Sequence, residues 1–445
     1  MGERLLWPAM NNDPQAAALD RLYSKVTRRI VPLMALGYIA AYLDRVNVGF
    51  AKLQMLGDLQ FSETVYGFGA GIFFVGYFLF EVPSNMMLHR IGARRWLARI
   101  MISWGIISAS MMFVTTPTSF YALRFLLGAA EAGFFPGVIY YLTQWYPAAR
   151  RGRIVALFMT AVAICSFAGS LISGAIMQAF DGAIGLAGWQ WLFLIEALPA
   201  LAIGVYFLLR LTDNIQVAAW LQPDEKAVLA AQLSADDAHT PAGTFKTAFQ
   251  DWRVWIACLI YFSCTSGIYG LGFWLPTIVA DMGVKSTLEI GMLTAIPYAE
   301  ATVGMVLVGR SSDRHLERRW HFAVSAALGG LGLVLSVQFS SYPVAALAAL
   351  TLATVGVMSA SPLFWSFPTA FLKSAAAAAG IAIINSIANL GGFVIPFLVG
   401  SIKDATGSTA NGMYFIAALL LSGAVLALAV RFAPTRGVVS RVSAA

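Results

Sequence analysis

The strongest constraint on this chain is a series of twelve apolar runs, each long enough to cross a lipid bilayer. A transmembrane helix needs about 20 apolar residues, and its backbone polar groups must pair within the helix because lipid offers no partners. The runs therefore predict an all-α polytopic membrane protein with twelve transmembrane helices. They lie at residues 30–50, 66–88, 97–116, 119–145, 154–177, 189–211, 253–279, 289–309, 321–339, 344–366, 378–402 and 410–432.

The composition excludes a soluble protein. Hydrophobic residues make up 59% of the 445 residues, and charged residues only 11%, whereas soluble domains contain about 25% charged residues. The cysteines Cys165, Cys258 and Cys264 all lie in apolar runs, a pattern that indicates neither a disulfide framework nor a metal cluster. We therefore expect no metal and no cofactor.

The positive charges predict the orientation in the membrane. An even number of spans places both termini on one side. Of the 29 Lys and Arg residues, Arg45 and Arg124 lie within spans, and Lys52, Lys285 and Lys403 lie on the side opposite the termini. All the others lie on the side of the termini or at its helix ends, and this side is therefore predicted to be the cytoplasm. The net charge of +7 is then a topology signal, and we expect no nucleic acid as a partner.

A polar segment divides the chain into two halves of six spans. It predicts a cytoplasmic linker at 212–252 between bundles at 30–211 and 253–432, with cytoplasmic tails at 1–29 and 433–445. The two halves also share a feature, because a short basic loop follows the second span of each, SNMMLHRIGARR and GRSSDRHLERR. Two related halves are typical of secondary transporters that bind substrate between them.

Over nearly its whole length the chain resembles the major facilitator superfamily. The two basic loops are similar to the signature loop of that superfamily, an Asp-Arg-x-Gly-Arg-Arg type sequence. The first loop has Asn85 and His89 where glycine and aspartate are usual. The resemblance implies that charged residues of these loops lock a cytoplasmic gate by pairing. They are Arg90, Arg94 and Arg95 in the first loop and Asp313, Arg314 and Arg318 in the second.

Longer motifs resemble the anion:cation symporter family within that superfamily. They are YLDRVNVGFA (42–51), FEVPSN in the second span, RFLLGAAEAGFFPGVIYYLTQWYP (124–147) and NSIANLGGFVIP in the eleventh. The stretch FWSFPTAFL is most similar to bacterial tartrate and aromatic-acid permeases. This resemblance implies proton-coupled uptake of a small organic anion, such as tartrate or another carboxylate, by a monomer in a bacterial inner membrane.

Four charged side chains share one layer near the middle of the membrane. A rise of about 1.5 Å per residue places Asp44 and Arg45 on the first span at the depth of Arg124 and Glu131 on the fourth. Arginine matches a carboxylate bidentately, and a buried acid can exchange a proton. The alternative is a static salt-bridge network between the two spans. The resemblance implies that Asp44 and Glu131 titrate and that Arg45 and Arg124 contact the anion.

Three further acids lie within spans. Glu81 and Glu196 each precede a proline, and both are interpreted as structural partners of loop arginines or of freed backbone N–H groups. Glu300 is interpreted as the sole buried acid of the second half. It is either specific to coupling or an incidental partner of a neighbouring span.

Polar aromatic residues and asparagines could complete a substrate site. Tyr269, Tyr298 and Asn389 are candidates from their positions in the second half, although packing explains most membrane aromatics equally well. Many members of the resembled family carry a polar side chain in the fifth span that helps to bind sugar acids, whereas this span is nearly apolar here. This departure favours a small or aromatic substrate over a long polyhydroxy acid. The resemblance implies that the cavity is lined by Tyr42, Tyr77, Trp365 and Asn385.

Three classes of function remain open. The first is a proton symporter, and the second is an anion exchanger or exporter, or an aromatic-acid or sugar-acid permease, on the same fold. The third is a transporter-like receptor or a membrane enzyme. We expect no enzyme, because no span carries a nucleophile motif or a histidine pair. No ATP-binding glycine loop of the Walker type occurs, and we therefore do not expect primary transport by this chain alone.

Overall fold

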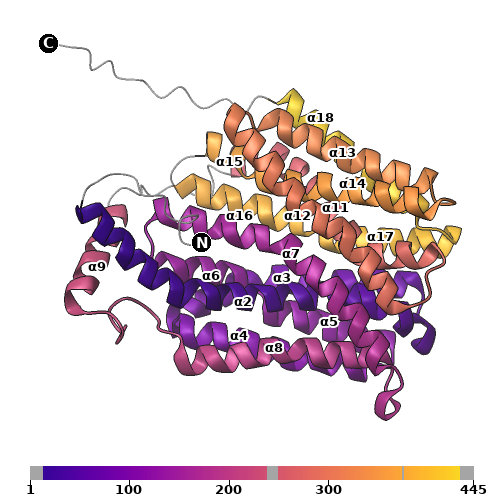
Figure 1. Cartoon of the computed structure of the whole chain (residues 1–445), viewed down its shortest axis with the longest axis horizontal. Coiled ribbons are helices and arrows are strands. Elements are labelled where there is room, and N and C mark those ends of the chain that lie inside the picture. The colour runs from indigo at the N-terminus through magenta and orange to yellow at the C-terminus, as the bar shows by residue number, and fades with distance from the viewer. Residues whose placement is uncertain (1–13, 238–248, 373–374, 431–445) are drawn as a thin grey trace.

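The computed structural model describes residues 14–237, 249–372 and 375–430, and this part of the chain consists of helices, turns and bends (Figure 1). Twelve of its helical segments are long and apolar enough to cross a membrane. The predicted all-α fold with twelve transmembrane helices is therefore confirmed.

The first half of the chain packs as one layer and the second half as another (Figure 1). The first contains α2 (Pro14–Leu59), α3 (Glu63–Ile91), α4 (Ala93–Ser110), α5 (Pro117–Glu131), α6 (Phe134–Thr143), α7 (Ala148–Phe180) and α8 (Gly188–Arg210). Helix α9 (Pro223–Asp237) follows in the linker. The second contains α11 (Trp252–Asp281), α12 (Thr287–His315), α13 (Arg319–Gln338), α14 (Pro343–Phe364), α15 (Ser366–Phe371), α16 (Ala375–Asn389), α17 (Gly391–Thr406) and α18 (Ala410–Ala429).

Polar side chains begin several of these helices. The first turn of a helix has N–H groups without intrahelical partners, and Ser, Thr or Asp satisfies one of them. Ser62 does so for α3, Thr116 for α5, Asp251 for α11 and Ser286 for α12. These caps fix the chain's entry into four helices at or near the membrane surface.

Helix α2 extends beyond the apolar run that predicted it. It starts at Pro14 and is 46 residues long, so part of the predicted tail is helical. Tyr23 and Val26 in this extension are buried, and Lys25 pairs with Glu225 of α9 at 2.6 Å. This lysine also holds the pKa of Glu225 below its ordinary value. The N-terminal extension of α2 therefore contacts the linker helix α9.

The fourth span is broken, although its apolar run is continuous. Helix α5 ends at Glu131, and α6 starts after Gly133, which has a φ of 84°. A Cβ atom at Gly133 would lie 2.4 Å from the Ser84 hydroxyl, so the turn needs glycine for both reasons. The break places Glu131 beside the N-terminus of α6, where the helix dipole favours negative charge.

Two helix pairs close one end of the interface between the halves. Helix α3 crosses α17, and α7 crosses α12, through glycines that leave no room for a side chain. A Cβ atom at Gly67 would lie 2.2 Å from the carbonyl oxygen of Pro396, and one at Gly174 would lie 2.6 Å from that of Thr287. Backbone therefore meets backbone across the two halves at this end.

Ion pairs join the halves at the same end. Glu63 of α3 lies 2.7 Å from the ammonium of Lys52 and 3.1 Å from that of Lys403, which also lies 3.3 Å from Asp281. Asp404 of α17 accepts a hydrogen bond of 3.0 Å from the backbone N–H of Glu63. We call this end the closed end.

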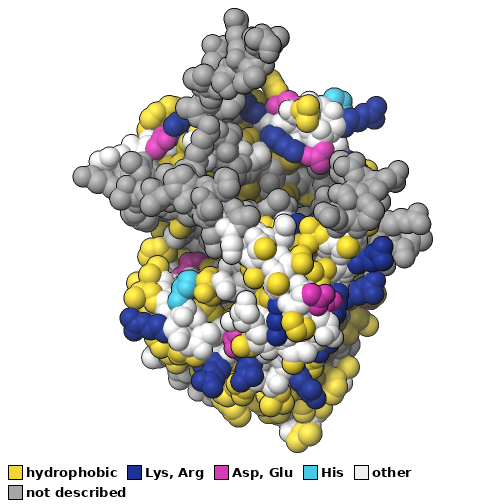
Figure 2. All heavy atoms as spheres, turned by 90° about the vertical axis from the view of Figure 1, so that its left-hand side faces the viewer, with side chains coloured by type: hydrophobic (Ala, Val, Ile, Leu, Met, Phe, Trp, Pro, Cys, Tyr) yellow, Lys and Arg dark blue, Asp and Glu magenta, His cyan; other side chains and the backbone are white. Residues whose placement is uncertain are grey.

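The other end, which we call the basic end, carries the predicted gate loops and α9. Lysine and arginine side chains lie around its rim in Figure 2. The backbone N–H of Arg94 donates to Asp213 at 2.7 Å, and Arg318 pairs with Asp313. The first contact joins α4 to the start of the linker, and the second lies within the loop after α12. The predicted locking of a gate by these residues stays a prediction.

Candidate functional site

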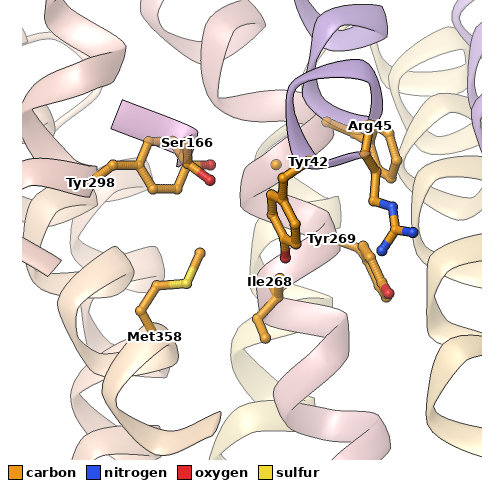
Figure 3. Close-up of a pocket in the computed structure, with 9 residues that line it drawn as sticks. Tyr42, Arg45, Ser166, Ile268, Tyr269, Tyr298 and Met358 are labelled. Atoms are coloured by element: carbon orange, nitrogen blue, oxygen red, sulfur yellow. The ribbon is translucent and has the colours of Figure 1, made fainter. Parts of the chain in front are cut away.

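A narrow pocket lies between the two halves. Figure 3 shows the Arg45 guanidinium and Tyr269 on one side of Tyr42, and Tyr298 and Met358 on the other. Helices α2 and α7 form one wall and α11, α12 and α14 the other. The lining residues are Tyr42, Arg45, Ser166, Ile268, Tyr269, Gly272, Phe273, Tyr298 and Met358.

Arg45 is the cation of this pocket. One of its terminal nitrogens pairs with the carboxylate of Glu131, and its Nε has no hydrogen-bond partner. The Arg45 side chain is 20% exposed, whereas that of Glu131 is 3% exposed. Arginine has five N–H donors, so Arg45 can hold Glu131 behind the wall and still present donors to an anion in front.

Aromatic rings surround the guanidinium of Arg45. Its Cζ atom lies 5.7 Å from the ring centre of Tyr42, 5.6 Å from that of Phe73 and 5.9 Å from that of Tyr77. Cation–π attraction of this kind fixes the plane of the guanidinium. Tyr77 therefore supports the guanidinium of Arg45; it is not among the lining residues of this pocket, and its cavity-lining role stays a prediction.

Asp44 points away from the pocket. Consecutive residues of a helix are about 100° apart, and Asp44 turns toward α4 while Arg45 turns toward Glu131. The Asp44 carboxylate accepts hydrogen bonds from the indole of Trp104, the hydroxyl of Ser108 and the amide of Asn47. The Asp44 carboxylate is buried, and all three of these donors are neutral.

Arg124 is also enclosed in the first half. Its Nε donates to the carbonyl oxygen of Gly69 at 3.2 Å, and its Nη2 donates to that of Ala70 at 3.1 Å. Phe73 lies under both arginines, 5.0 Å from Arg124 Cζ. In this conformation Arg124 ties α5 to α3 rather than lining the pocket, and its contact with an anion stays a prediction.

The second half supplies most of the pocket wall. Its Tyr269 hydroxyl donates to Asn389 at 3.0 Å, so α16 orients a ring of α11. Trp365 packs edge-on against Tyr261 at 4.8 Å, and Asn385 is partly buried on α16. Neither Trp365 nor Asn385 is among the lining residues of this pocket, and their predicted roles remain untested.

Glu300 lies on the outer face of α12, and the expectation that it is buried is wrong. Helical periodicity places it on the same stripe as the exposed residues Ile296, Val303 and Leu307. The pocket residue Tyr298 lies on the opposite face of the helix. A span position alone does not say which face carries a residue, and for Glu300 that face is the outer one.

The sequence pattern missed several wall residues because they are apolar. Ile268, Gly272 and Phe273 of α11 and Met358 of α14 carry no charge or motif that marks them. Their spacing is the only available signal, since positions 268, 269, 272 and 273 share one helical face. That face could be chosen only once the packing of α11 against α2 was known.

The geometry suits binding of an anion without covalent chemistry. One arginine bridges the pocket and a buried carboxylate, so an incoming anion competes with Glu131 for it. In the described part of the chain, no group of three His, Cys, Asp or Glu side chains could hold a metal ion. The pocket therefore offers charge recognition beside aromatic surface.

Comparisons with known proteins agree on the family. Residues 34–396 match the model of the Major Facilitator Superfamily. The chain is 50% identical over 410 residues to the "Putative metabolite transport protein NicT" of Pseudomonas putida, covering 92% of this chain and 94% of that protein. It is also 50% identical over 431 residues to a "Putative tartrate transporter" of Agrobacterium vitis, covering 96% and 98%.

A solved structure shares the fold at low identity. The "D-xylose-proton symporter" superimposes with a TM-score of 0.73 at 16% identity and covers 91% of this chain and 98% of its own. The resemblance to bacterial organic-acid permeases is confirmed by the relatives at 50% identity. The chain therefore belongs to the major facilitator superfamily, and it is a multi-pass membrane transporter rather than an enzyme.

Proposed function

We propose that this protein is a proton-coupled symporter that takes up a small organic anion, such as tartrate or another carboxylate, by alternating access. The observation that carries the proposal is the pair of Arg45 and Glu131 at the wall of a pocket between the two halves. The printed name of the Agrobacterium vitis relative supports a dicarboxylate such as tartrate as the first substrate to test.

The proposed cycle needs only competition for Arg45. An anion that binds the guanidinium draws it away from Glu131, and the carboxylate then gains a proton because a buried charge without a partner is costly. Loss of that proton on the other side returns Glu131 to Arg45 and expels the anion. One coupled proton supplies about 1.4 kcal/mol per pH unit, or tenfold accumulation.

The positions of the charges support an orientation for this cycle. Because Lys and Arg gather on the cytoplasmic side of membrane proteins, the basic end faces the cytoplasm and the closed end faces outward. Both termini are then cytoplasmic, the membrane is a bacterial inner membrane, and the protein acts as a monomer. In this orientation the glycine crossings and the Lys52–Glu63 pair seal the outer side.

Uptake into vesicles tests the proposal. Purified protein in liposomes is given labelled tartrate, with and without an inward pH gradient. Symport predicts that a gradient of one pH unit raises accumulation by about tenfold. Uptake that requires tartrate or another anion inside the vesicle, and ignores the pH gradient, would show an exchanger instead.

A further inference from the structure

Glu196 on α8 is a buried acid that the proposed cycle does not use. Its side chain is 3% exposed, and Oε1 accepts a hydrogen bond of 2.7 Å from the hydroxyl of Ser173 on α7. The other oxygen, Oε2, has no hydrogen-bond partner. In the described part of the chain, no Lys or Arg forms a salt bridge with it. The predicted partners, loop arginines or freed backbone N–H groups, do not lie against it.

Asn47 brings this acid into contact with the machinery of α2. Its amide nitrogen donates to Asp44 at 2.9 Å, and a looser side-chain hydrogen bond links Asn47 to Glu196. The amide oxygen of Asn47 is fully buried and has no partner. Glu196 Oε2 and Asn47 Oδ1 therefore lack hydrogen bonds of normal geometry, although they belong to two side chains that are linked to each other deep in the first half.

The charges around these oxygens do not balance. Around these oxygens the first half holds three acids, Asp44, Glu131 and Glu196, and two arginines, Arg45 and Arg124, while the buried Lys52 pairs with Glu63 at the closed end. Arg45 neutralises Glu131, and Arg124 acts on Asp44 from a distance. One negative charge remains without a cation. An uncompensated charge costs several kcal/mol in such surroundings, so a small cation is needed there.

We infer that Glu196 and Asn47 bind one monovalent cation, a proton or a sodium ion, at a site separate from the pocket. Unpaired carboxylate and amide oxygens are suited to either cation, and the Ser173 hydroxyl is within reach of the same carboxyl group. A divalent ion fits less well, because no three His, Cys, Asp or Glu side chains of the described chain gather to hold it. Binding itself does not depend on the proposed function, although coupling to transport rests on it.

The surroundings of Glu196 contain few other groups that could respond to the cation. Helix α2 presents Asp44 and Asn47 to it, and α7 presents Ser173. Helix α4 presents Trp104 and Ser108, which bond to Asp44 instead. A cation bound at this site would therefore affect Asp44 through the hydrogen bond of Asn47. Asp44 is adjacent in sequence to Arg45, which lies in the pocket wall.

Thermal unfolding of the purified protein, without any organic anion, tests the inference. One series raises sodium chloride against choline chloride at fixed ionic strength, and another varies the pH between about 5 and 8 without sodium. If sodium binds, its addition raises the melting temperature. If a proton binds, the melting temperature rises as the pH falls, because the folded protein holds more protons than the unfolded chain.

Glu196→Gln should remove whichever response the original protein shows, since the amide neither titrates nor supplies charge. Glu289→Gln, an exposed acid of α12, is the matched control and should keep it. Equal sodium and pH responses in the original protein and Glu196→Gln would overturn the inference. If Glu196→Gln does not fold, Glu196→Met, which also lacks a carboxylate, replaces it, and an unchanged cation response there overturns the inference as well. Because no anion is present, failure here leaves anion binding by Arg45 to be judged separately.

Discussion

The two halves of the molecule divide the work of the site between them. In the first half the buried polar residues include Asp44, Arg124, Glu131 and Glu196. In the second half no Asp, Glu, Lys or Arg among the described residues is buried, and its buried polar residues are serines and threonines. Tyrosines, a phenylalanine and a methionine of that half face the pocket instead.

This difference has a physical reason and a mechanistic consequence. Buried charges are tolerated in lipid only when they are close to partners, so collecting them in one bundle lets them compensate each other. The other bundle can then move past them without carrying a charge through the membrane. The first half is therefore expected to decide whether an anion and a cation bind, and the second half to decide which anion fits.

The largest effect is expected at Arg45. Arg45→Ala removes the only cation among the pocket residues and leaves Glu131 unpaired, and loss of one partner of such a pair costs about 2–5 kcal/mol. Tartrate binding, measured by calorimetry, should weaken at least about 30-fold. Arg99→Ala, on the exposed face of α4, should bind normally. Normal affinity in Arg45→Ala would contradict anion binding by Arg45.

Glu131→Gln should separate exchange from accumulation. The amide imitates the protonated carboxyl group but cannot release a proton, so the loaded carrier can still change between its two faces. Counterflow of labelled tartrate should persist, while the accumulation of about tenfold per pH unit should disappear. A variant that still concentrates tartrate across one pH unit would favour the static salt-bridge interpretation.

The second half should give smaller effects that depend on the substrate. Tyr269→Phe removes the hydroxyl that bonds to Asn389 but keeps the ring at the pocket wall. A net hydrogen bond contributes about 0.5–1.5 kcal/mol, so affinity should fall by about two- to tenfold. Competition assays with tartrate and an aromatic acid should show unequal losses. Equal losses for both anions would mean that this wall does not select between them.

The smallest effect is expected at Glu300. It lies on an exposed apolar stripe of α12, away from the pocket, so Glu300→Gln should leave both proton-driven uptake and counterflow within about twofold of normal, as surface substitutions usually do. A selective loss of proton-driven uptake would show that the second half contributes an acid to coupling after all.

The sequence predicted the spans well because lipid imposes a strong and simple rule on backbone polar groups. It also identified the charged residues at mid-depth, since such residues are rare and stand out. It did not predict the partners of those residues. Asp44 and Arg45 are adjacent, but Asp44 accepts hydrogen bonds from neutral donors while Arg45 forms an ion pair with Glu131. Arg124 donates to two carbonyl oxygens.

The errors share one cause. Hydropathy indicates how deep a residue lies in the membrane, but it indicates neither which face of the helix carries the residue nor where the helix breaks. The run at 119–145 gives no sign that α5 stops at Glu131, because the Ala132–Gly133 turn is as apolar as a helix. Glu300 has the depth of a buried residue and faces outward. The aromatic wall of α11 became identifiable only through its packing against α2.

The glycine crossings at the closed end affect how well this protein prevents ions from leaking across the membrane. Each elementary charge that leaks across a potential of 100 mV dissipates about 2.3 kcal/mol. A seal made of side chains loosens whenever a rotamer changes, but the contact of Gly67 with the Pro396 carbonyl involves backbone on both sides. Such a contact opens only when whole helices part, so that ions have no route past it between transport events.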